Sequence, residues 1–252
     1  MQEYIAVSKS SKEILNLANL LKNLEVNALI SGDLGVGKKS LAHYILPKAK
    51  NFDAKELQQE IVIHPLGIKK SSIIVNKIEN ITNIDLFIQW TKNNHIRVIA
   101  TSLKKELNPR IMELFSTKIE LPPFSQRKED IQALALKFSK EASKTLDMKQ
   151  LPQSRLILNI SNNAHSLKKS IFFSYLFETI KEDEIFMIMQ KYMEAKIQEE
   201  SSYKKLLHLF EVPLLNLAKR KYKSQVKMAK YLGLNRITLR KKIEQHKGYL
   251  DD

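Results

Sequence analysis

The sequence contains no cysteine, which excludes disulfide bonds and thiolate metal sites. It has no apolar run of membrane-spanning length, and its first residues, MQEYIAVSKSSKEIL, lack the apolar core of a signal peptide. We therefore expect a soluble cytoplasmic protein without a membrane partner. The six histidines have no metal-ligand spacing with carboxylates, so we expect them to be structural and predict no metal site.

Acidic residues are outnumbered by basic ones, 27 against 42, and the formal net charge is +15. Residues 201–252 contain 13 Lys and Arg against 4 Asp and Glu, a net charge of +9, whereas the preceding 200 residues have a net charge of +6. On charge alone, such an excess indicates a polyanionic partner, either nucleic acid or an acidic membrane surface, and of these we expect nucleic acid. With 252 residues, 43% of them hydrophobic, the chain can bury one sizeable core and carry a small further module.

The first half of the sequence alternates between helical and strand patterns. Three segments have the apolar spacing of helices: 10–24, 38–49 and 83–94. Four apolar runs are typical of buried strands: 27–32, 60–67, 71–78 and 96–102. Ser10 or Ser11 is expected to cap the first helix, and Pro47 to end the second. Strands that alternate with helices favour the α/β class, with a parallel sheet covered on both faces.

The second half shows helical periodicity only. The pattern covers four segments: 128–143, 153–161, 165–180 and 182–197. Pro122 and Pro123 mark the expected boundary before these helices, and a polar stretch at 198–202 precedes the basic end of the chain. We therefore predict three domains: an α/β subdomain at 1–123, a helical subdomain at 124–198 and a basic module at 199–252.

The strongest pattern is SQVKMAKYLGLNRITLRKKIEQH, residues 224–246, which predicts two short helices meeting at a tight turn. Ala229 is small where the helices must approach, Gly233 suits a positive-φ turn, and Asn235 can cap the second helix. The residues expected on the inner faces are Met228, Leu232, Leu234, Leu239 and Ile243. The donors expected to face outward, towards phosphates or guanine edges, are Arg236, Thr238, Arg240, Lys241 and Lys242. The simpler alternative is a helical hairpin with a solvated basic face.

The preceding residues, YKKLLHLFEVPLLNLAKRKY, add two amphipathic helices, the second opened by Pro213. Residues 210–250 resemble, nearly end to end, the Fis-type DNA-binding domain. In that family the two upstream helices form a dimer and the helix-turn-helix enters the major groove. The resemblance implies a homodimer on double-stranded DNA, with Ser224 and Gln225 near the DNA backbone. It also implies a DNA-facing set: Asn235, Arg236, Thr238, Arg240, Lys241 and Lys242.

The stretch SGDLGVGKKS, residues 31–40, lies between an apolar run and a helical segment. Its glycines and Lys38 have the spacing at which backbone amides surround a phosphate with a lysine beside it. The predicted nucleotide-binding residues are Gly32, Asp33, Leu34, Gly35, Val36, Gly37, Lys38, Lys39 and Ser40. Two interpretations remain open: a loop that binds ATP or ADP, and a retained loop that holds nothing or a stray anion.

The stretch SGDLGVGKK is similar to the glycine loop of the NtrC family, AAA+ ATPases that remodel polymerase carrying sigma-54. IRVIATS is similar to that family's sensor-one strand, and IELPPFSQRKEDIQALALKF follows its entry into the helical lid. The resemblance extends from about Tyr4 to Tyr249. It implies an AAA+-like P-loop parallel sheet with a helical lid subdomain, followed by an all-α Fis-type helix-turn-helix domain.

The residues that would hydrolyse ATP depart from this pattern. Lys39 stands where P-loop proteins usually place a hydroxyl on Mg²⁺, although the NtrC family itself often has glutamate there. In the stretch IIVNKI, Asn76 and Lys77 replace the Walker-B aspartate and glutamate, which position Mg²⁺ and polarise the attacking water. Glu79 comes two residues later and is expected to point elsewhere. The sequence therefore predicts no catalytic residue.

Other NtrC-family parts are also missing. His165 occupies the place of the sensor-two arginine, and Arg110 is the lone candidate for an arginine finger. The sigma-contacting loop, with a sequence near GAFTGA, has no counterpart. We predict a DNA-binding transcriptional regulator whose hydrolysis-deficient AAA+ domain serves nucleotide sensing, dimerisation or contact with RNA polymerase or another regulator. Two alternatives stay open: a divergent sigma-54-type ATPase activator, and an architectural DNA-bending protein.

Overall fold

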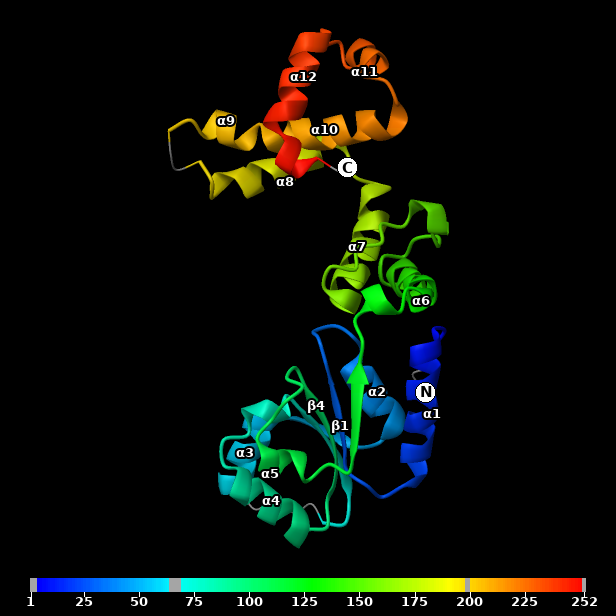
Figure 1. Cartoon of the computed structure of the whole chain (residues 1–252), viewed down its shortest axis with the longest axis vertical. Helices are drawn as coiled ribbons and strands as arrows, with labels where there is room; N and C mark the ends of the chain where they lie inside the picture. The colour runs from blue at the N-terminus through cyan, green and yellow to red at the C-terminus, as the bar shows by residue number, and fades with distance from the viewer. Residues whose placement is uncertain (1–3, 64–68, 198–199, 251–252) are drawn as a thin grey trace. The chain divides into compact units, whose positions relative to one another are not determined.

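The computed structural model describes residues 4–63, 69–197 and 200–250. The chain forms two compact units, with the division between Thr179 and Ile180. The first unit contains a β-sheet with helices around it, and the second is built of helices (Figure 1). Among the described helices, none is long and apolar enough to cross a membrane.

Five parallel strands form the sheet of the first unit, in the order β2-β3-β4-β1-β5. They are β1 (Ala28–Gly32), β2 (Lys50–Asp53), β3 (Ser72–Asn76), β4 (Arg97–Ser102) and β5 (Thr117–Leu121). Leu29 of β1 is paired with Ala100 of β4 on one side and with Lys118 of β5 on the other. Because the strands are parallel and in this order, the carboxyl ends of β3, β4 and β1 lie next to one another.

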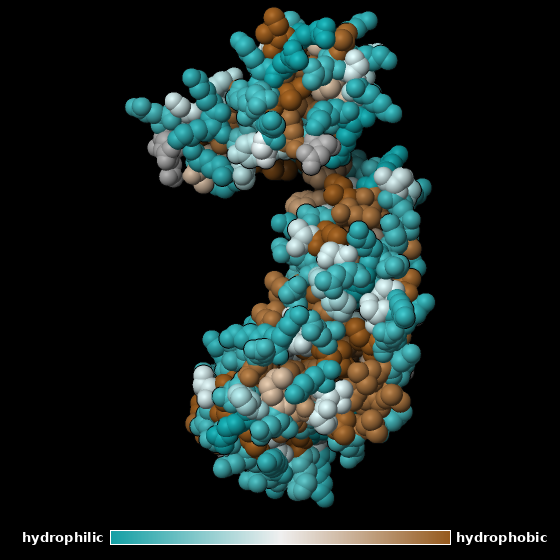
Figure 2. Space-filling model, in the orientation of Figure 1, coloured by the Kyte–Doolittle hydropathy of each residue, from teal (hydrophilic) through white to brown (hydrophobic). Residues whose placement is uncertain are grey.

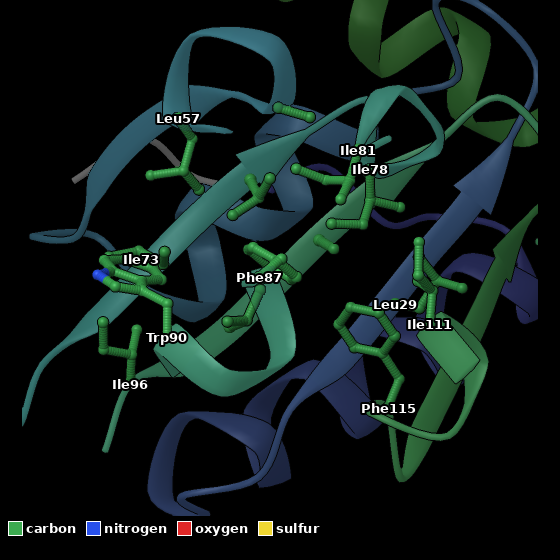
Figure 3. Packing of buried hydrophobic residues seen from close by; sticks show 14 residues of the cluster. Leu29, Leu57, Ile73, Ile78, Ile81, Phe87, Trp90, Ile96, Ile111 and Phe115 are labelled. Carbon is green, nitrogen blue, oxygen red and sulfur yellow. The ribbon is translucent and has the colours of Figure 1, made fainter. Parts of the chain in front are cut away.

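Helices cover both faces of the sheet, as expected for the α/β class (Figure 1). One face carries α1 (Lys9–Asn23) and α2 (Lys38–Ile45); the other carries α3 (Ala54–Ile63), α4 (Ile84–Asn93) and the short α5 (Pro109–Met112). Successive strand residues point to opposite faces. Ile30 and Ile74 therefore pack with α1 and α2, whereas Leu29 and Ile73 belong to the core on the other face. There, Ile73 lies near Trp90 of α4 and Leu29 lies near Ile111 of α5 (Figure 3).

The strands expected at 27–32, 71–78 and 96–102 are confirmed as β1, β3 and β4. The strand expected at 60–67 is wrong for 60–63, which form the end of α3, and its remaining residues lie outside the described part of the chain. β2 and β5 have no counterpart among the predicted strands. Their sequences, KNFD and TKIEL, contain too few consecutive apolar residues to give a strand signal.

The three helices expected in the first half of the chain are confirmed as α1, α2 and α4. The cap of α1 differs from the prediction. Ser8 precedes the helix, and its Oγ accepts a hydrogen bond of 3.2 Å from the backbone N–H of Ser11. Ser11 is thus the residue whose N–H is satisfied by the cap, rather than the cap itself.

A helical subdomain follows β5 within the first unit. It consists chiefly of α6 (Glu129–Thr145) and α7 (Asn163–Phe177), which confirm the helices expected at 128–143 and 165–180. The two helices share a core that includes Ala135 and Ala142 of α6 with Leu167 and Ile171 of α7.

The helix expected at 153–161 is wrong. The chain forms one 3₁₀ turn (Gln153–Arg155) and then has no regular helix up to α7. The backbone N–H of Ile157 donates to Ser174 Oγ (2.8 Å), and that of Asn159 donates to Ser170 Oγ (3.1 Å). Because hydroxyls of α7 satisfy these backbone groups, the segment needs no helical hydrogen bonds.

The second unit contains five α-helices among its described residues. They are α8 (Glu182–Glu194), α9 (Ser202–Leu206), α10 (His208–Lys221), α11 (Gln225–Tyr231) and α12 (Arg236–Gln245). Leu215 and Ala218 of α10 pack with Met228 and Ala229 of α11 and with Leu239 of α12. The helix expected at 182–197 is confirmed as α8, which belongs to this unit. The division into 1–123, 124–198 and 199–252 stays a prediction.

Pro213 does not open a helix as expected. α10 begins at His208 and contains Pro213 in its interior. Leu207, between α9 and α10, already has helical dihedral angles (φ −59°, ψ −30°), so the helical path is established upstream of the proline. The pyrrolidine ring removes one intrahelical donor at this point.

Candidate functional site

The glycine loop leaves β1 and enters α2 with a backbone that favours glycine. Gly32, Gly35 and Gly37 all have positive φ, at 141°, 77° and 102°. Gly37 is the N-cap of α2, so the first backbone N–H groups of the helix have no intrahelical acceptor and remain free for another acceptor. Of the predicted nucleotide-binding residues, the exposed ones are Asp33, Leu34, Lys39 and Ser40; the others are buried or half-buried.

Lys38 lies inside this loop, with only 9% of its surface exposed. Its Nζ donates hydrogen bonds of 2.6 Å to the carbonyl oxygens of Gly32 and Asp33. Burial lowers the pKa of Lys38, and the nearby carboxylates of Glu79 and Asp33 oppose that shift. The lysine is therefore positioned to neutralise negative charge at the loop.

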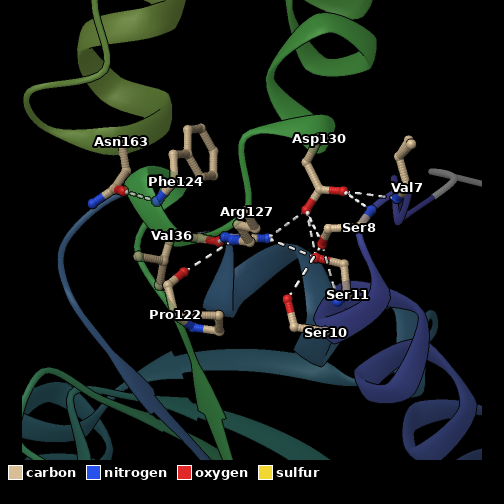
Figure 4. A network of polar contacts seen from close by, with 10 residues as sticks. All are labelled: Val7, Ser8, Ser10, Ser11, Val36, Pro122, Phe124, Arg127, Asp130 and Asn163. Carbon is tan, nitrogen blue, oxygen red and sulfur yellow. Dashed lines mark hydrogen bonds and ion pairs between the residues drawn. The ribbon is translucent and has the colours of Figure 1, made fainter.

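The helical subdomain holds three successive carbonyl groups of the loop. Leu34 O accepts from Asn163 Nδ2 (2.9 Å), and Gly35 O accepts from the backbone N–H of Ala164 (3.1 Å). Val36 O accepts from the guanidinium of Arg127 (Figure 4). In a trans peptide the carbonyl and the following N–H point in opposite directions. These bonds therefore turn the following N–H groups away from the lid, in an arrangement that fits a phosphate.

Arg127 and Asp130 form a buried polar cluster beside this loop (Figure 4). Their side chains are 2% and 0% exposed. Arg127 also donates to Pro122 O (2.9 Å), while Asp130 accepts from the backbone N–H groups of Val7 (2.7 Å) and Ser8 (2.8 Å). The cluster thus connects the N-terminal segment, the end of β5, the glycine loop and the lid. No sequence pattern predicts it, because its members are up to 123 residues apart.

Asn76 and Lys77, the predicted Walker-B replacements, both have partners in the structure. Asn76 is 4% exposed; its Nδ2 donates to Asn51 Oδ1 and to Phe52 O (3.2 Å), and its Oδ1 lies 3.3 Å from Thr101 Oγ1. Lys77 has a left-handed backbone (φ 54°), and its Nζ lies 3.4 Å from Asp53. Neither side chain supplies a carboxylate.

The usual magnesium ligands of a P-loop site do not fit these residues. Lys39 and Asn76, predicted to stand at the positions of the hydroxyl and the aspartate, offer an ammonium group and an amide. No cluster of three or more His, Cys, Asp or Glu side chains suited to a metal occurs among the residues described. A nucleotide phosphate fits better, because the loop offers backbone donors and Lys38.

Glu79 is the acidic residue that follows the two predicted Walker-B positions. It lies in a 3₁₀ turn (Ile78–Asn80) after β3, and its Oε1 accepts from the backbone N–H of Leu103 (3.1 Å), just after β4. Its charge also acts on Lys38. The side chain therefore points to the segment after β4, at the end of the sheet from which the glycine loop leaves β1.

His165 and Arg110, the residues predicted at the positions of the sensor-two arginine and the arginine finger, have different surroundings. His165 packs against the glycine loop: a Cβ on Gly35 would lie 2.7 Å from the His165 ring. Arg110 donates to Asp85 of α4 over 3.1 Å, in an exposed ion pair. The Arg110 guanidinium is therefore paired with a carboxylate of its own chain.

In the second unit, the two helices α11 and α12 meet at Gly233, whose φ is 64°. Asn235 caps α12, because its Oδ1 accepts from the backbone N–H of Thr238 over 2.7 Å. The predicted inner-face residues are confirmed: Met228 and Leu239 are buried, and Leu232, Leu234 and Ile243 pack against them. The turn therefore forms as the sequence predicts.

The predicted DNA-facing residues separate into two groups. The exposed ones are Gln225, Asn235, Arg236, Arg240 and Lys241; the half-buried ones are Ser224, Thr238 and Lys242. Gln225 of α11 lines a shallow depression of about 440 Å³ together with Arg240 and Lys241 of α12. The structure thus brings residues from both helices together on one surface.

Lys242 does not simply point outward as expected. Its Nζ forms an ion pair with Glu211 of α10, whose other carboxylate oxygen lies 2.8 Å from His246 Nε2. Burial disfavours the charged form of Glu211, but the bonds from Lys242 and His246 outweigh it and hold the pKa of this carboxyl below its usual range. Lys242 therefore ties α12 to α10.

Comparison with known proteins supports the fold. No family profile matches the sequence, and no curated protein matches it. The fold of the chain is similar to that of NtrX from Brucella abortus in complex with ADP, with a TM-score of 0.62 and 13% identity over 97% of this chain and 69% of that one. The complex of NtrX with ATP gives a TM-score of 0.58 at the same identity and coverage. A single-residue variant of Thermotoga maritima RuvB gives 0.50 at 15% identity, over 96% of this chain and 88% of that one.

Proposed function

We propose that this protein is a DNA-binding transcriptional regulator whose AAA+ domain binds ATP or ADP without hydrolysing it. The observation that carries the proposal is the α11–α12 surface. Its inner residues are buried, its turn requires Gly233, and its outer face carries Arg236, Arg240 and Lys241. A short helix with exposed arginines and a small-residue turn is suited to the major groove.

The charges of the second unit support a nucleic-acid partner. Residues 201–252 have a net charge of +9, and hydrophilic side chains cover much of the visible face of this unit (Figure 2). Arg236 and Arg240 are four residues apart on α12, so they lie on the same side of the helix. We propose a Fis-type helix-turn-helix in which these arginines contact base edges and Ser224 and Gln225 lie near the DNA backbone.

An apolar stripe on α10 supports a homodimer. Phe210, Leu214 and Leu217 are 62%, 40% and 63% exposed, and their spacing places them on one side of the helix. Exposed apolar side chains grouped in this way are typical of an interaction surface. A second copy of the chain would bury them and would present two α12 helices to two half-sites on double-stranded DNA.

The glycine loop supports nucleotide binding. Its positive-φ glycines, the lid bonds to its carbonyls and the buried Lys38 form a site suited to phosphates. The similar NtrX structures were solved with ADP and with ATP. Hydrolysis would need a carboxylate to activate water, and Asn76 and Lys77 stand at the positions where the family has its acids. A regulatory contact with RNA polymerase or another regulator is the role we propose for this domain.

DNA binding is tested by fluorescence anisotropy with promoter fragments of the source genome and with random duplexes of the same length. We expect tighter binding to some promoter fragments, and we expect Arg236→Ala and Arg240→Ala each to weaken that binding by about 1–3 kcal/mol. Lys204→Ala is the control, because Lys204 is an exposed cation on α9, away from the proposed reading helix. Equal losses in all three variants would mean that the total charge, and not α12, determines binding.

The same titrations distinguish a regulator from an architectural protein. A steep dependence on salt with no preference for promoter fragments would favour DNA bending without sequence choice, and would contradict the specific part of the proposal. Phosphate release is measured in parallel, with Lys38→Ala as the control. Turnover that this substitution abolishes would favour the divergent ATPase.

A further inference from the structure

Glu79 lies where the neighbouring strands β3 and β4 end, at the end of the sheet from which the glycine loop leaves β1. It lies in the 3₁₀ turn just after β3, and its Oε1 accepts a hydrogen bond from the backbone N–H of Leu103, which follows β4 directly. The strand order places β4 between β3 and β1, and the glycine loop leaves the carboxyl end of β1. Ligands of open parallel sheets bind at the carboxyl ends of the strands. Glu79 thus lies at the end of the sheet where a nucleotide would bind.

One oxygen of this carboxylate has no satisfied interaction. Glu79 Oε2 is buried and has no hydrogen-bond partner among the residues that the structure describes. The bond to Leu103 and the strand order place the carboxylate at the same end of the sheet as the glycine loop. Its negative charge counteracts the lowering of the pKa of Lys38 by burial, and Lys38 is the lysine that reaches the β- and γ-phosphates in P-loop proteins. A half-buried carboxylate with one unpartnered oxygen therefore lies at the end of the sheet where the terminal phosphate of a bound nucleotide would come.

In an ordinary P-loop site, Mg²⁺ would offset such crowding of negative charge. Here Lys39 and Asn76 replace the usual magnesium ligands, and both the nitrogen and the oxygen of the Asn76 amide group are already engaged with neighbours. A third phosphate would consequently meet the Glu79 carboxylate without a metal ion between them. A diphosphate ends earlier and avoids most of this repulsion.

We propose that Glu79 makes the glycine-loop site selective for nucleoside diphosphates over triphosphates. The inference rests on the proposed nucleotide binding and names its ligand class. Lys38 and the loop amides hold the two phosphates, while the Glu79 carboxylate disfavours a third. The protein would then report the diphosphate form of the nucleotide pool and would need no bond cleavage to do so.

Isothermal titration calorimetry of the full chain with ADP and with ATP, in EDTA, tests this selectivity. We expect ADP to bind at least about tenfold more tightly than ATP, and Glu79→Gln to raise the affinity for ATP about tenfold while changing that for ADP much less. A tenfold change equals about 1.4 kcal/mol. That is the interaction of two unit charges about 12 Å apart at an effective dielectric constant of about 20, so the effect does not require direct contact. Glu56→Gln, which removes an exposed carboxylate of α3, is the control and should change neither affinity.

The outcomes distinguish a failure of the proposed role of Glu79 from a failure of the proposed nucleotide binding. Equal affinities for ADP and ATP, or a ratio unchanged in Glu79→Gln, would overturn the role of Glu79 and leave nucleotide binding in place. ATP affinity that rises with Mg²⁺ in the wild type, but not in Glu79→Gln, would also overturn it, because Glu79 would then be a metal ligand. Binding of neither nucleotide, in the wild type or the variant, would remove the nucleotide site itself.

Discussion

Removal of the Arg127 guanidinium is the sharpest test of how the first unit is held together. In Arg127→Ala, Asp130 stays fully buried and keeps its hydrogen bonds from Val7, Ser8 and Ser11, but loses its cationic partner. The carbonyl oxygens of Pro122 and Val36 lose a donor at the same time. The substitution therefore leaves a buried carboxylate without a counter-ion and two backbone acceptors with fewer bonds, at the junction of β5, the glycine loop and the lid.

The structure sets the expected size of this effect. Breaking a buried ion pair by removing one partner costs about 3–5 kcal/mol, whereas an exposed pair contributes about 0–1 kcal/mol. The matched exposed pair is Arg110–Asp85 in the same unit, with side chains that are 60% and 58% exposed. We therefore expect Arg127→Ala to lower the free energy of unfolding by about 3–5 kcal/mol, and Arg110→Ala by less than about 1 kcal/mol.

Urea denaturation followed by tryptophan fluorescence measures this difference. Trp90 is the only tryptophan of the chain, and it lies in the core of the first unit at 8% exposure, so its emission reports the unfolding of that unit (Figure 3). With a urea dependence of about 2 kcal/mol/M, the midpoint of Arg127→Ala should fall by about 1.5–2.5 M. Arg127→Lys keeps the charge but loses the planar fork, and should give an intermediate midpoint.

A result in which Arg127→Ala and Arg110→Ala have the same midpoint would refute this reasoning. It would mean that the burial of the Arg127–Asp130 pair does not determine its importance, and that water replaces the guanidinium at little cost. The lid and the N-terminal segment would then be held by their apolar contacts alone.

Two further predictions concern the glycine loop and the link between α10 and α12. Gly35→Ala should lower the free energy of unfolding of the first unit by about 1–3 kcal/mol in the same urea assay, because its Cβ would lie 2.7 Å from the His165 ring in a backbone with φ of 77°. A urea midpoint equal to that of the wild type would contradict this close packing. Glu211 has a depressed pKa in the folded chain, so its contribution to stability is present above the unfolded value of about 4.5 and is lost as the pH falls through the folded pKa. Glu211→Gln should therefore have a lower melting temperature than the wild type at pH 7, measured by circular dichroism. The difference in melting temperature should shrink in acid, because the wild-type carboxylate then loses its bonds to Lys242 and His246. A difference that does not change with pH would contradict this pH dependence.

Local sequence signals predicted much of the backbone. Apolar runs identified β1, β3 and β4, and helical periodicity identified α1, α2, α4, α6, α7 and α8. Gly233 and Asn235 determined the turn and the cap of α12, because positive φ and side-chain capping depend on one or two neighbouring residues. The same locality explains the errors. The segment after Gln153 has a helical apolar pattern, yet hydroxyls of α7 satisfy its backbone from outside.

The sequence by itself determined the class of the fold, the glycine loop and the basic helical end of the chain, because each follows from periodicity, composition or the spacing of a few adjacent residues. Only the tertiary structure decided which groups act together. The bond between Asp130 and Val7 spans 123 residues, Glu79 bonds to the residue that follows the neighbouring strand β4, and Lys242 turns to Glu211 rather than outward. Such pairings depend on where the folded chain brings distant segments, and no local pattern encodes them.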